Sequence, residues 1–356
     1  MLLKFLIRSA LLVAVAGLAA CGNSGSHHPA YVTVPSSNLV LGFNVDNNSG
    51  SLSSMSGSPF SAGSSPIVTV IHPSGKFLYV ANSGENDISL YRVQTSGVLT
   101  EIMPRTPAGV STLALAIDSG GNFLYAANEG SNNVSAYSID SGSGMLKAVS
   151  GSPFQTPNPL ALRVSPTAKF LYVANANQGT ISIFSINAGK LTEISGSPVG
   201  AGPNPSSIAI DPSGHFLYTT NLTSNTLVAF TVNPSSGALS YVPPVFFFAG
   251  TSPTSATIDS SGKFLYVANL GSNNITGYTI NSNSGALASI GGSPFATGTE
   301  PVFTVVDPNG KFLFVGNESS DNVYGYKIDP GSGALTATNP PSFTTLVAPT
   351  SMAIGQ

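Results

Sequence analysis

GKFLYVAN, residues 75–82, decides the fold, because close variants of it recur along the whole chain. A degenerate first copy begins at Tyr31, and the later copies end at Asn128, Asn175, Asn221, Asn269 and Asn317. Successive copies are 48, 46, 47, 46, 48 and 48 residues apart. A period of this length is typical of β-propeller blades rather than of helical solenoids. Seven copies therefore predict seven blades.

Each repeat has the composition of four short strands. In the copy at 205–253, β-rich runs occupy 206–210, 216–220, 226–232 and 238–242. Turn-forming sequences such as Asp211-Pro212-Ser213-Gly214 and Asn233-Pro234-Ser235-Ser236-Gly237 separate them. Four strands joined by tight turns predict one antiparallel blade per repeat.

The two ends of the chain complement each other. The first copy starts in what corresponds to a second strand, and residues 349–354 match the first strand at 205–210. A propeller cannot leave such an edge unpaired. We therefore expect an all-β, seven-bladed propeller over 31–356, closed by three N-terminal strands and one C-terminal strand.

The first 21 residues have the pattern of an export signal. A basic start with Lys4 and Arg8 precedes a short apolar run, which ends in Leu18-Ala19-Ala20-Cys21. This ending resembles the bacterial lipobox, which implies cleavage before Cys21 and lipid modification of its sulfur. The expected protein is exported and anchored by lipid to the bacterial cell envelope, at the outer membrane or at a periplasmic or outer face. A plain secretory signal with a chance cysteine is the alternative. Residues 22–30 are expected to form a flexible tether.

Charge and motifs exclude several classes of function. Without Lys4 and Arg8, ten of the 12 basic residues remain against 15 acidic residues. This acidic balance argues against a nucleic-acid partner. The sequence has no phosphate-cradling glycine loop, no zinc-ligand spacing and no GxSxG nucleophile motif. We expect neither a cofactor nor a metal ion.

The repeated block PSGKFLYVAN, followed by a Tyr- or Phe-bearing strand and by Ser-Gly-Ala-Leu, resembles the seven-bladed lactonase family over essentially 31–356. That family includes 6-phosphogluconolactonase-like and carboxymuconate-lactonizing propellers, and the repeat is also similar to YVTN-type surface propellers. The resemblance implies hydrolysis of a lactone ring. The muconate-lactonizing relatives imply Arg, His and Glu side chains at the mouth of the channel, and the chain shows no matching constellation. The motifs that carry the resemblance are turns and strands, so they indicate the fold rather than the reaction.

Residues that depart from the repeat are the best functional candidates in a single sequence. Arg163 stands in a first strand, where the other copies have Val, Ala or Thr, and first strands line the channel. Glu300 precedes another first strand, where other copies have Asn or Ser, and Arg105 lies in a connection between blades. Arg163 and Glu300 are the candidate catalytic residues, with Arg163 binding a substrate carboxylate or carbonyl and Glu300 positioning water. Arg105 is a candidate ligand-binding residue.

Two interpretations remain open at this stage. In the first, the protein hydrolyses a small lactone outside the cytoplasm. In the second, it is a non-catalytic propeller, attached to the membrane through its N-terminal lipid, whose loop-rich face binds a protein or a cell-envelope polymer. The scarcity of histidine and of uncommitted cations favours the second, and the resemblance favours the first. Convergence of Arg163 and Glu300 on one pocket would favour the enzyme.

Overall fold

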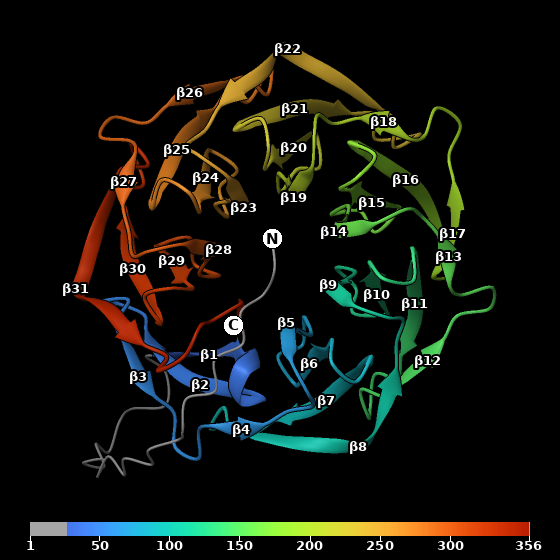
Figure 1. Ribbon diagram of the computed structural model, residues 1–356, viewed down its shortest axis with the longest axis vertical. Helices are drawn as coiled ribbons and strands as arrows, with labels where there is room; N and C mark the ends of the chain where they lie inside the picture. Colours follow the sequence, from blue (N-terminus) through green and yellow to red (C-terminus); the bar gives the residue numbers. More distant parts are fainter. Residues whose placement is uncertain (1–26, 356) are drawn as a thin grey trace.

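Seven antiparallel sheets, each built on four main strands, are arranged in a ring in the computed structural model (Figure 1), and we call the region between their innermost strands the channel. The structure describes residues 27–355. It confirms the all-β, seven-bladed propeller that the repeat predicts. Helix is confined, in the described part of the chain, to the 3₁₀ turn η1 (Pro35–Ser37). No helix within 27–355 is long and apolar enough to cross a membrane.

The first blade combines both ends of the chain. From the channel outward it contains β32 (Ser351–Ile354), β1 (His27–Val34), β2 (Leu39–Asp46) and β3 (Leu52–Ser54), and the short β4 (Phe60–Ser61) pairs with β2. β32 runs antiparallel to β1, with Tyr31 opposite Ala353. All described strands thus pair within 27–355, and the last strand closes the ring.

The other six blades use consecutive strands, with the first of each blade innermost. The second blade is β5 (Pro66–Ile71), β6 (Phe77–Asn82), β7 (Asp87–Val93) and β8 (Leu99–Pro107). The third is β9 (Thr112–Ile117), β10 (Phe123–Asn128), β11 (Asn133–Ile139) and β12 (Leu146–Ala148), with β13 (Phe154–Gln155). The fourth is β14 (Pro159–Val164), β15 (Phe170–Asn175), β16 (Thr180–Asn187) and β17 (Lys190–Glu193), with β18 (Val199–Gly200).

The remaining three blades follow the same order. The fifth is β19 (Pro205–Ile210), β20 (Phe216–Asn221), β21 (Thr226–Val232) and β22 (Leu239–Phe248). The sixth is β23 (Pro253–Ile258), β24 (Phe264–Asn269), β25 (Asn274–Ile280) and β26 (Leu287–Ser289), with β27 (Phe295–Ala296). The seventh is β28 (Pro301–Val306), β29 (Phe312–Asn317), β30 (Asn322–Ile328) and β31 (Leu335–Thr344).

Strand β1 begins four residues before the expected start of the propeller. His27 pairs with Asp46 of β2, and its Nδ1 lies 3.8 Å from the Asp46 carboxylate. Residues 27–30, expected as the end of a tether, therefore belong to the first blade. Cys21 and the remainder of the expected signal and tether lie outside the described residues.

The repeated second strand is apolar along its whole length because neighbouring blades cover both of its faces. All six residues of β6, β15, β20, β24 and β29 are buried. The turn that leads into each strand is fixed by its own side chains. In the sixth blade, Asp259 Oδ1 accepts hydrogen bonds from the backbone N–H groups of Lys263 and Phe264, at 2.9 and 2.8 Å.

At five of the seven interfaces, the tyrosine of this strand links one blade to the next. Its hydroxyl donates a hydrogen bond to the carbonyl of a glycine in the outer hairpin of the following blade. The pairs are Tyr31–Gly97, Tyr79–Gly144, Tyr172–Gly237, Tyr218–Gly285 and Tyr266–Gly333. In four of these pairs, all except Tyr31–Gly97, the phenylalanine two residues before the tyrosine packs on the same glycine. A Cβ on Gly237 would lie only 2.5 Å from the ring of Phe170. The two most repeated sequence blocks therefore meet across every such interface.

Two of the seven interfaces lack this hydrogen bond. Phe314 replaces the tyrosine in the seventh blade and has no hydroxyl. In the third blade, the buried Tyr125 hydroxyl has no hydrogen-bond partner. The hairpin that follows it in the fourth blade is reduced to a two-residue turn, Ala188–Gly189, between the paired residues Asn187 and Lys190.

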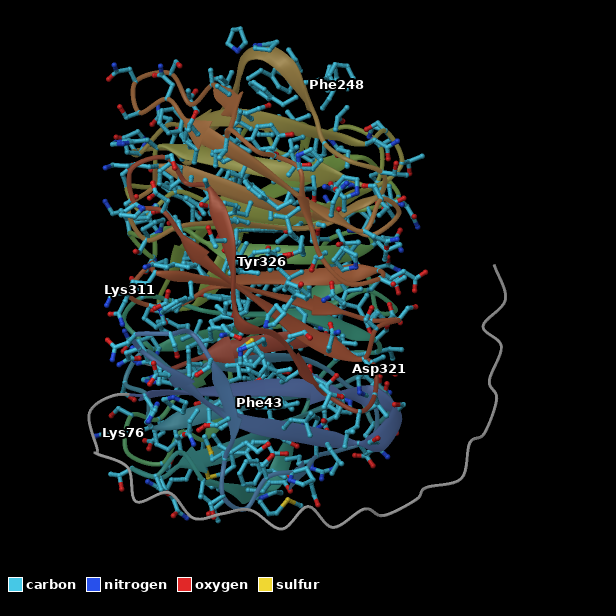
Figure 2. All side chains as sticks on the ribbon, turned by 90° about the vertical axis from the view of Figure 1, so that its left-hand side faces the viewer. Phe43, Lys76, Phe248, Lys311, Asp321 and Tyr326 are labelled. Carbon is cyan, nitrogen blue, oxygen red and sulfur yellow. The ribbon has the colours of Figure 1, made fainter. Side chains whose placement is uncertain are left out.

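The disc has two distinct faces. We call the face with the turns between first and second strands, such as 72–76 and 307–311, the turn face. The opposite face, with the loops between second and third strands, such as 83–86 and 318–321, is the loop face. Lys76 and Lys311 lie on one side of the disc and Asp321 on the other (Figure 2). First strands begin at the loop face and end at the turn face.

Replacing Tyr266 by Phe is expected to lower the free energy of unfolding by about 1–2 kcal/mol, because the buried carbonyl of Gly333 loses its donor. The matched control is Tyr125→Phe, which removes an equally buried hydroxyl that has no partner and is expected to be neutral or stabilising. Chemical denaturation of both variants measures the difference. Equal destabilisation by both substitutions would contradict the proposed role of the hydrogen bond.

Candidate functional site

Arg163 projects from the channel wall near the turn face. It is the fifth of six residues in β14, and the innermost strands of neighbouring blades lie beside β14 on either side. Its one protein hydrogen bond is a long contact of 3.5 Å from Nη1 to the carbonyl of Leu162. No carboxylate of the described residues 27–355 lies within ion-pair distance of it. Arg163 is therefore an uncompensated cation in the channel.

A cavity of about 160 Å³ surrounds the Arg163 side chain. The turn-face ends of β14, β19 and β23 line it, and Thr257 is its other polar side chain among otherwise apolar residues. Solvent reaches the guanidinium, but the surrounding strands desolvate it, which lowers the pKa of Arg163. A cation in such a place is stabilised by an incoming anion. The cavity supplies no carboxylate or histidine that could act as a base.

Two glutamates meet at the other mouth of the channel, on the loop face of the seventh blade. Glu300 immediately precedes β28, and Glu318 immediately follows β29. The backbone N–H of Glu318 donates to the carbonyl of Glu300 at 2.8 Å, which holds the two residues side by side. The hydroxyl of Ser319 donates to the Glu300 carboxylate. The pair therefore places two carboxyl groups near each other on the loop face.

The surroundings of this pair shift the pKa of the Glu318 carboxyl. Partial desolvation raises the pKa of the Glu318 carboxyl, and the negative charge of Glu300 raises that pKa further. A carboxylate with a raised pKa is a better proton acceptor near neutral pH than an ordinary one. Glu318 is thus suited to accept a proton from water, whereas the sequence prediction named only Glu300, as the residue that positions water.

Glu300 has a backbone conformation that is unfavourable for glutamate. Its φ is +56°, in the left-handed region, and the equivalent residues Ser252, Asn204 and Asn158 share that region. Asparagine tolerates this conformation and glutamate does so poorly. The conformation belongs to the repeat, and a glutamate at this point costs stability.

Arg163 and Glu300 do not converge. Glu300 corresponds to Asn158, which precedes β14 by one residue, whereas Arg163 is five residues further along the strand. Five residues of extended strand span roughly 16 Å. Because all first strands run in the same direction, the two side chains lie near opposite ends of the channel. The structure therefore separates the two predicted catalytic residues into two sites.

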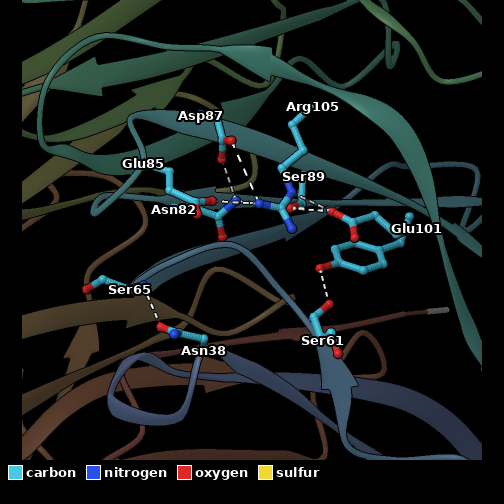
Figure 3. Close-up of polar contacts among 10 residues, drawn as sticks. Asn38, Ser61, Ser65, Asn82, Glu85, Asp87, Ser89, Glu101 and Arg105 are labelled. Atoms are coloured by element: carbon cyan, nitrogen blue, oxygen red, sulfur yellow. Dashed lines mark hydrogen bonds and ion pairs between the residues drawn. The ribbon is translucent and has the colours of Figure 1, made fainter.

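Arg105 is occupied by carboxylates rather than available to a ligand (Figure 3). Its Nε donates to Glu101 at 2.7 Å, and its Nη1 contacts Glu85 at 2.6 Å and Asp87 at 3.9 Å. The hydrogen bond to Glu101, followed by the nearby negative charges, raises the pKa of Arg105. Asn82, the repeated residue at the end of β6, donates to Asp87 at 2.7 Å and extends the cluster toward the channel. Arg105 thus links the segments of the second blade that carry Glu85, Asp87 and Glu101.

A second hollow on the loop face is polar and uncharged. It measures about 450 Å³ and lies between the loop after β15 and the connection into β19. Asn177, Gln178 and Asn204 contribute amide groups to its lining. Amide donors and acceptors without charge suit hydroxyl groups better than phosphate.

Electrostatics distinguish the loop face from the rest of the molecule. Its acidic residues are Glu85, Asp87, Glu129, Glu300, Glu318 and Asp321, and Arg105 is its one Lys or Arg within 27–355. Because Arg105 is already paired, this face has no uncommitted cation for a phosphate group. Phosphate recognition normally needs several converging donors. The loop face therefore favours uncharged ligands.

Comparisons with known proteins agree with this architecture. A family model described as lactonase, 7-bladed beta-propeller, matches residues 24–163, 154–246 and 240–348. No curated protein sequence matches the chain.

Solved structures resemble the whole ring. A protein from Bacteroides uniformis, described provisionally as a 6-phosphogluconolactonase, has a TM-score of 0.82 and 20% identity, over 92% of this chain and 99% of that one. The periplasmic gluconolactonase of Pseudomonas aeruginosa has a TM-score of 0.78 and 20% identity, over 93% and 99%. Hydrazine synthase of Kuenenia stuttgartiensis has a TM-score of 0.63 and 18% identity, over 88% and 99%. At these identities the likeness shows a shared fold.

Replacing Glu300 by Asn is expected to stabilise the protein by up to about 1 kcal/mol, because asparagine accepts the left-handed conformation and the repulsion of Glu318 is removed. The reciprocal change, Asn204→Glu in the fifth blade, should be destabilising. Thermal unfolding of the two variants tests both signs. A destabilised Glu300→Asn variant would contradict the assignment of backbone strain to Glu300.

Proposed function

We propose that this chain, which belongs to the seven-bladed β-propeller lactonase family, hydrolyses an uncharged, polyhydroxylated lactone at the loop-face mouth of its channel. The observation that carries the proposal is the Glu300–Glu318 pair, in which desolvation and the neighbouring charge raise the pKa of Glu318. The likeness to a periplasmic gluconolactonase supports a sugar lactone as the class of substrate.

The residues of the pair have distinct roles in the proposed reaction. Glu318 accepts a proton from a water molecule, and the water oxygen adds to the carbonyl carbon of the lactone. The bond between that carbon and the ring oxygen then breaks, and the Glu318 carboxyl returns the proton to the departing ring oxygen. The product is the open-chain hydroxy acid. Glu300 acts through Glu318, since its charge keeps the pKa of the base high.

The charge of the loop face refines the choice of substrate. A phosphorylated lactone would bring negative charge to a face whose one cation is paired with Glu85 and Glu101. An uncharged lactone avoids this repulsion. We therefore favour an unphosphorylated sugar lactone over 6-phosphogluconolactone.

A second candidate function rests on Arg163. Its uncompensated guanidinium and the adjacent cavity of about 160 Å³ suit a small carboxylate. Because the cavity provides no base, this site would bind a ligand without hydrolysing it. Substitution of Arg163 therefore distinguishes ligand binding in this cavity from hydrolysis at the loop face in a single experiment.

Purified protein should hydrolyse glucono-1,5-lactone faster than buffer alone. Glu318→Gln should reduce kcat by about 10²-fold or more, in the usual range for loss of a general base. Arg163→Ala serves as the control and should leave kcat unchanged. Turnover that survives in Glu318→Gln but disappears in Arg163→Ala would overturn the loop-face site, and no turnover in the native protein would overturn the hydrolase.

The pH dependence provides an independent test of the base. The base works only when deprotonated, so kcat/KM should fall as the pH decreases through the pKa of Glu318, which is raised above the ordinary value of a glutamate. In Glu300→Asn the neighbouring charge is gone, and this acidic limb should move to lower pH. An acidic limb at the same pH in Glu300→Asn as in the native protein would contradict the coupling of Glu300 and Glu318.

We also infer that the protein is exported and held at the cell envelope by lipid on Cys21. The support is the lipobox-like Leu18-Ala19-Ala20-Cys21, and Cys21 is the one cysteine in the sequence. Mass spectrometry of protein from the native host should find acyl chains on Cys21, and Cys21→Ser should lose them and leave the membrane fraction. An unacylated N-terminus in the native protein would refute the anchor.

A further inference from the structure

The turn face presents basic side chains at one repeated position. In six blades the residue just before the second strand lies at this face, and His28, within β1, occupies the aligned position in the first blade. The position holds His28, Lys76, Asn122, Lys169, His215, Lys263 and Lys311 in the seven blades. All four lysines are exposed, and Figure 2 shows Lys76 and Lys311 at the same side of the disc. The repeat thus arranges basic residues as a ring around the channel.

These lysines are not paired with carboxylates. Among residues 27–355, no lysine lies within ion-pair distance of an acidic side chain. The nearest carboxylates in the same turns, such as Asp259 and Asp307, are buried and accept hydrogen bonds from backbone N–H groups. The ammonium groups are therefore available to an external partner.

Further cations lie toward the same face. Arg92 and Lys327 pair with Phe77 and Phe312 at the turn-face ends of their strands, and Lys190 closes a hairpin on that side. The outer hairpins on this face also carry Asp46, Asp140 and Asp329, whose carboxylates accept hydrogen bonds from backbone N–H groups of their own turns. The loop face carries Glu85, Asp87, Glu129, Glu300, Glu318 and Asp321. The exposed lysines lie on the turn face, whereas the loop face has six carboxylates against one paired arginine. The field of an anionic surface therefore favours the orientation in which the turn face is toward that surface.

The chain enters the propeller at the turn face. His28 aligns with Lys76 in the repeat, and its Nε2 lies 2.8 Å from Nδ2 of Asn309 in the turn of the seventh blade. Cys21, where the sequence predicts a lipid, is six residues before His27. Six residues span at most about 20 Å. A lipid at Cys21 would therefore hold the turn face, rather than the loop face, close to the membrane.

We propose that the turn face is a docking surface for a bilayer with anionic headgroups, with Lys76, Lys169, Lys263 and Lys311 as its principal contacts. Each lysine near an anionic bilayer contributes about 1 kcal/mol, or roughly five-fold in binding. A lipid anchor and a basic surface together give firmer attachment than one acyl chain. Docked in this way, the disc turns its loop face away from the membrane, where it is open to a soluble ligand.

The test uses the chain from Gly22 to Gln356, which keeps every described strand and lacks the lipid. Its binding to vesicles of phosphatidylcholine with about a third phosphatidylglycerol is measured by sedimentation at low salt. A variant with all four ring lysines changed to Gln should bind about 100-fold more weakly or worse. The native chain should also lose binding in high salt.

The control places the same change of charge on the opposite face. Asn177→Asp, Gln178→Glu, Thr223→Glu and Thr299→Glu together add four negative charges to the loop face, and this variant should keep most of the binding. Equal loss in both variants, equal binding to pure phosphatidylcholine, or no binding of the native chain would overturn the proposal. Thermal unfolding verifies that both variants are folded. If the variant with all four lysines replaced is unfolded, the double variant Lys263→Gln/Lys311→Gln is used instead, and its vesicle binding should be roughly 25-fold weaker than that of the native chain.

Discussion

The contact between the tyrosine of one blade and the outer-hairpin glycine of the next is the interaction on which this ring depends. Phe170 packs on Gly237 while Tyr172 donates to its carbonyl at 3.0 Å, and the same pair of contacts recurs at three further interfaces. A single blade cannot satisfy these groups, because the partner always lies in its neighbour. The contact also explains why the blocks GKFLY and SGAL persist together in a chain whose loops vary. Closure by β32 then supplies the innermost strand that the first blade lacks.

The sequence predicts most of the fold because its periodic constraints are local. Turn residues and buried strands recur at fixed offsets, so the expected runs 206–210, 216–220 and 226–232 match β19, β20 and β21 to within a residue. The fourth strand was harder to delimit, since β22 continues through Pro243 and Pro244 to Phe248. The start of β1 at His27 was missed because residues 27–30 resemble a linker in composition and are held by pairing with β2.

The site was only partly predictable, because departures from a repeat identify unusual residues but not their neighbours. Arg163 and Glu300 both break the pattern, yet their different positions along the first strand place them toward opposite faces. Arg105 could not be assigned, since Glu85, Asp87 and Glu101 reach it from different segments. Glu318 resembled a solvated loop residue, and its interest arises from its proximity to Glu300 in space. The same scaffold therefore gives its two faces different chemistry: carboxylates on one, and lysines on the other.

A crystal structure with gluconolactam, a ring amide that cannot be cleaved as the lactone is, tests the central claim most directly. The account predicts that the lactam binds at the loop-face mouth of the channel, with its carbonyl carbon close enough to Glu318 for one water molecule to lie between them. Lactam bound beside Arg163 at the turn-face end, with the Glu300–Glu318 pair unoccupied, would contradict the account and move the site to the other end of the channel.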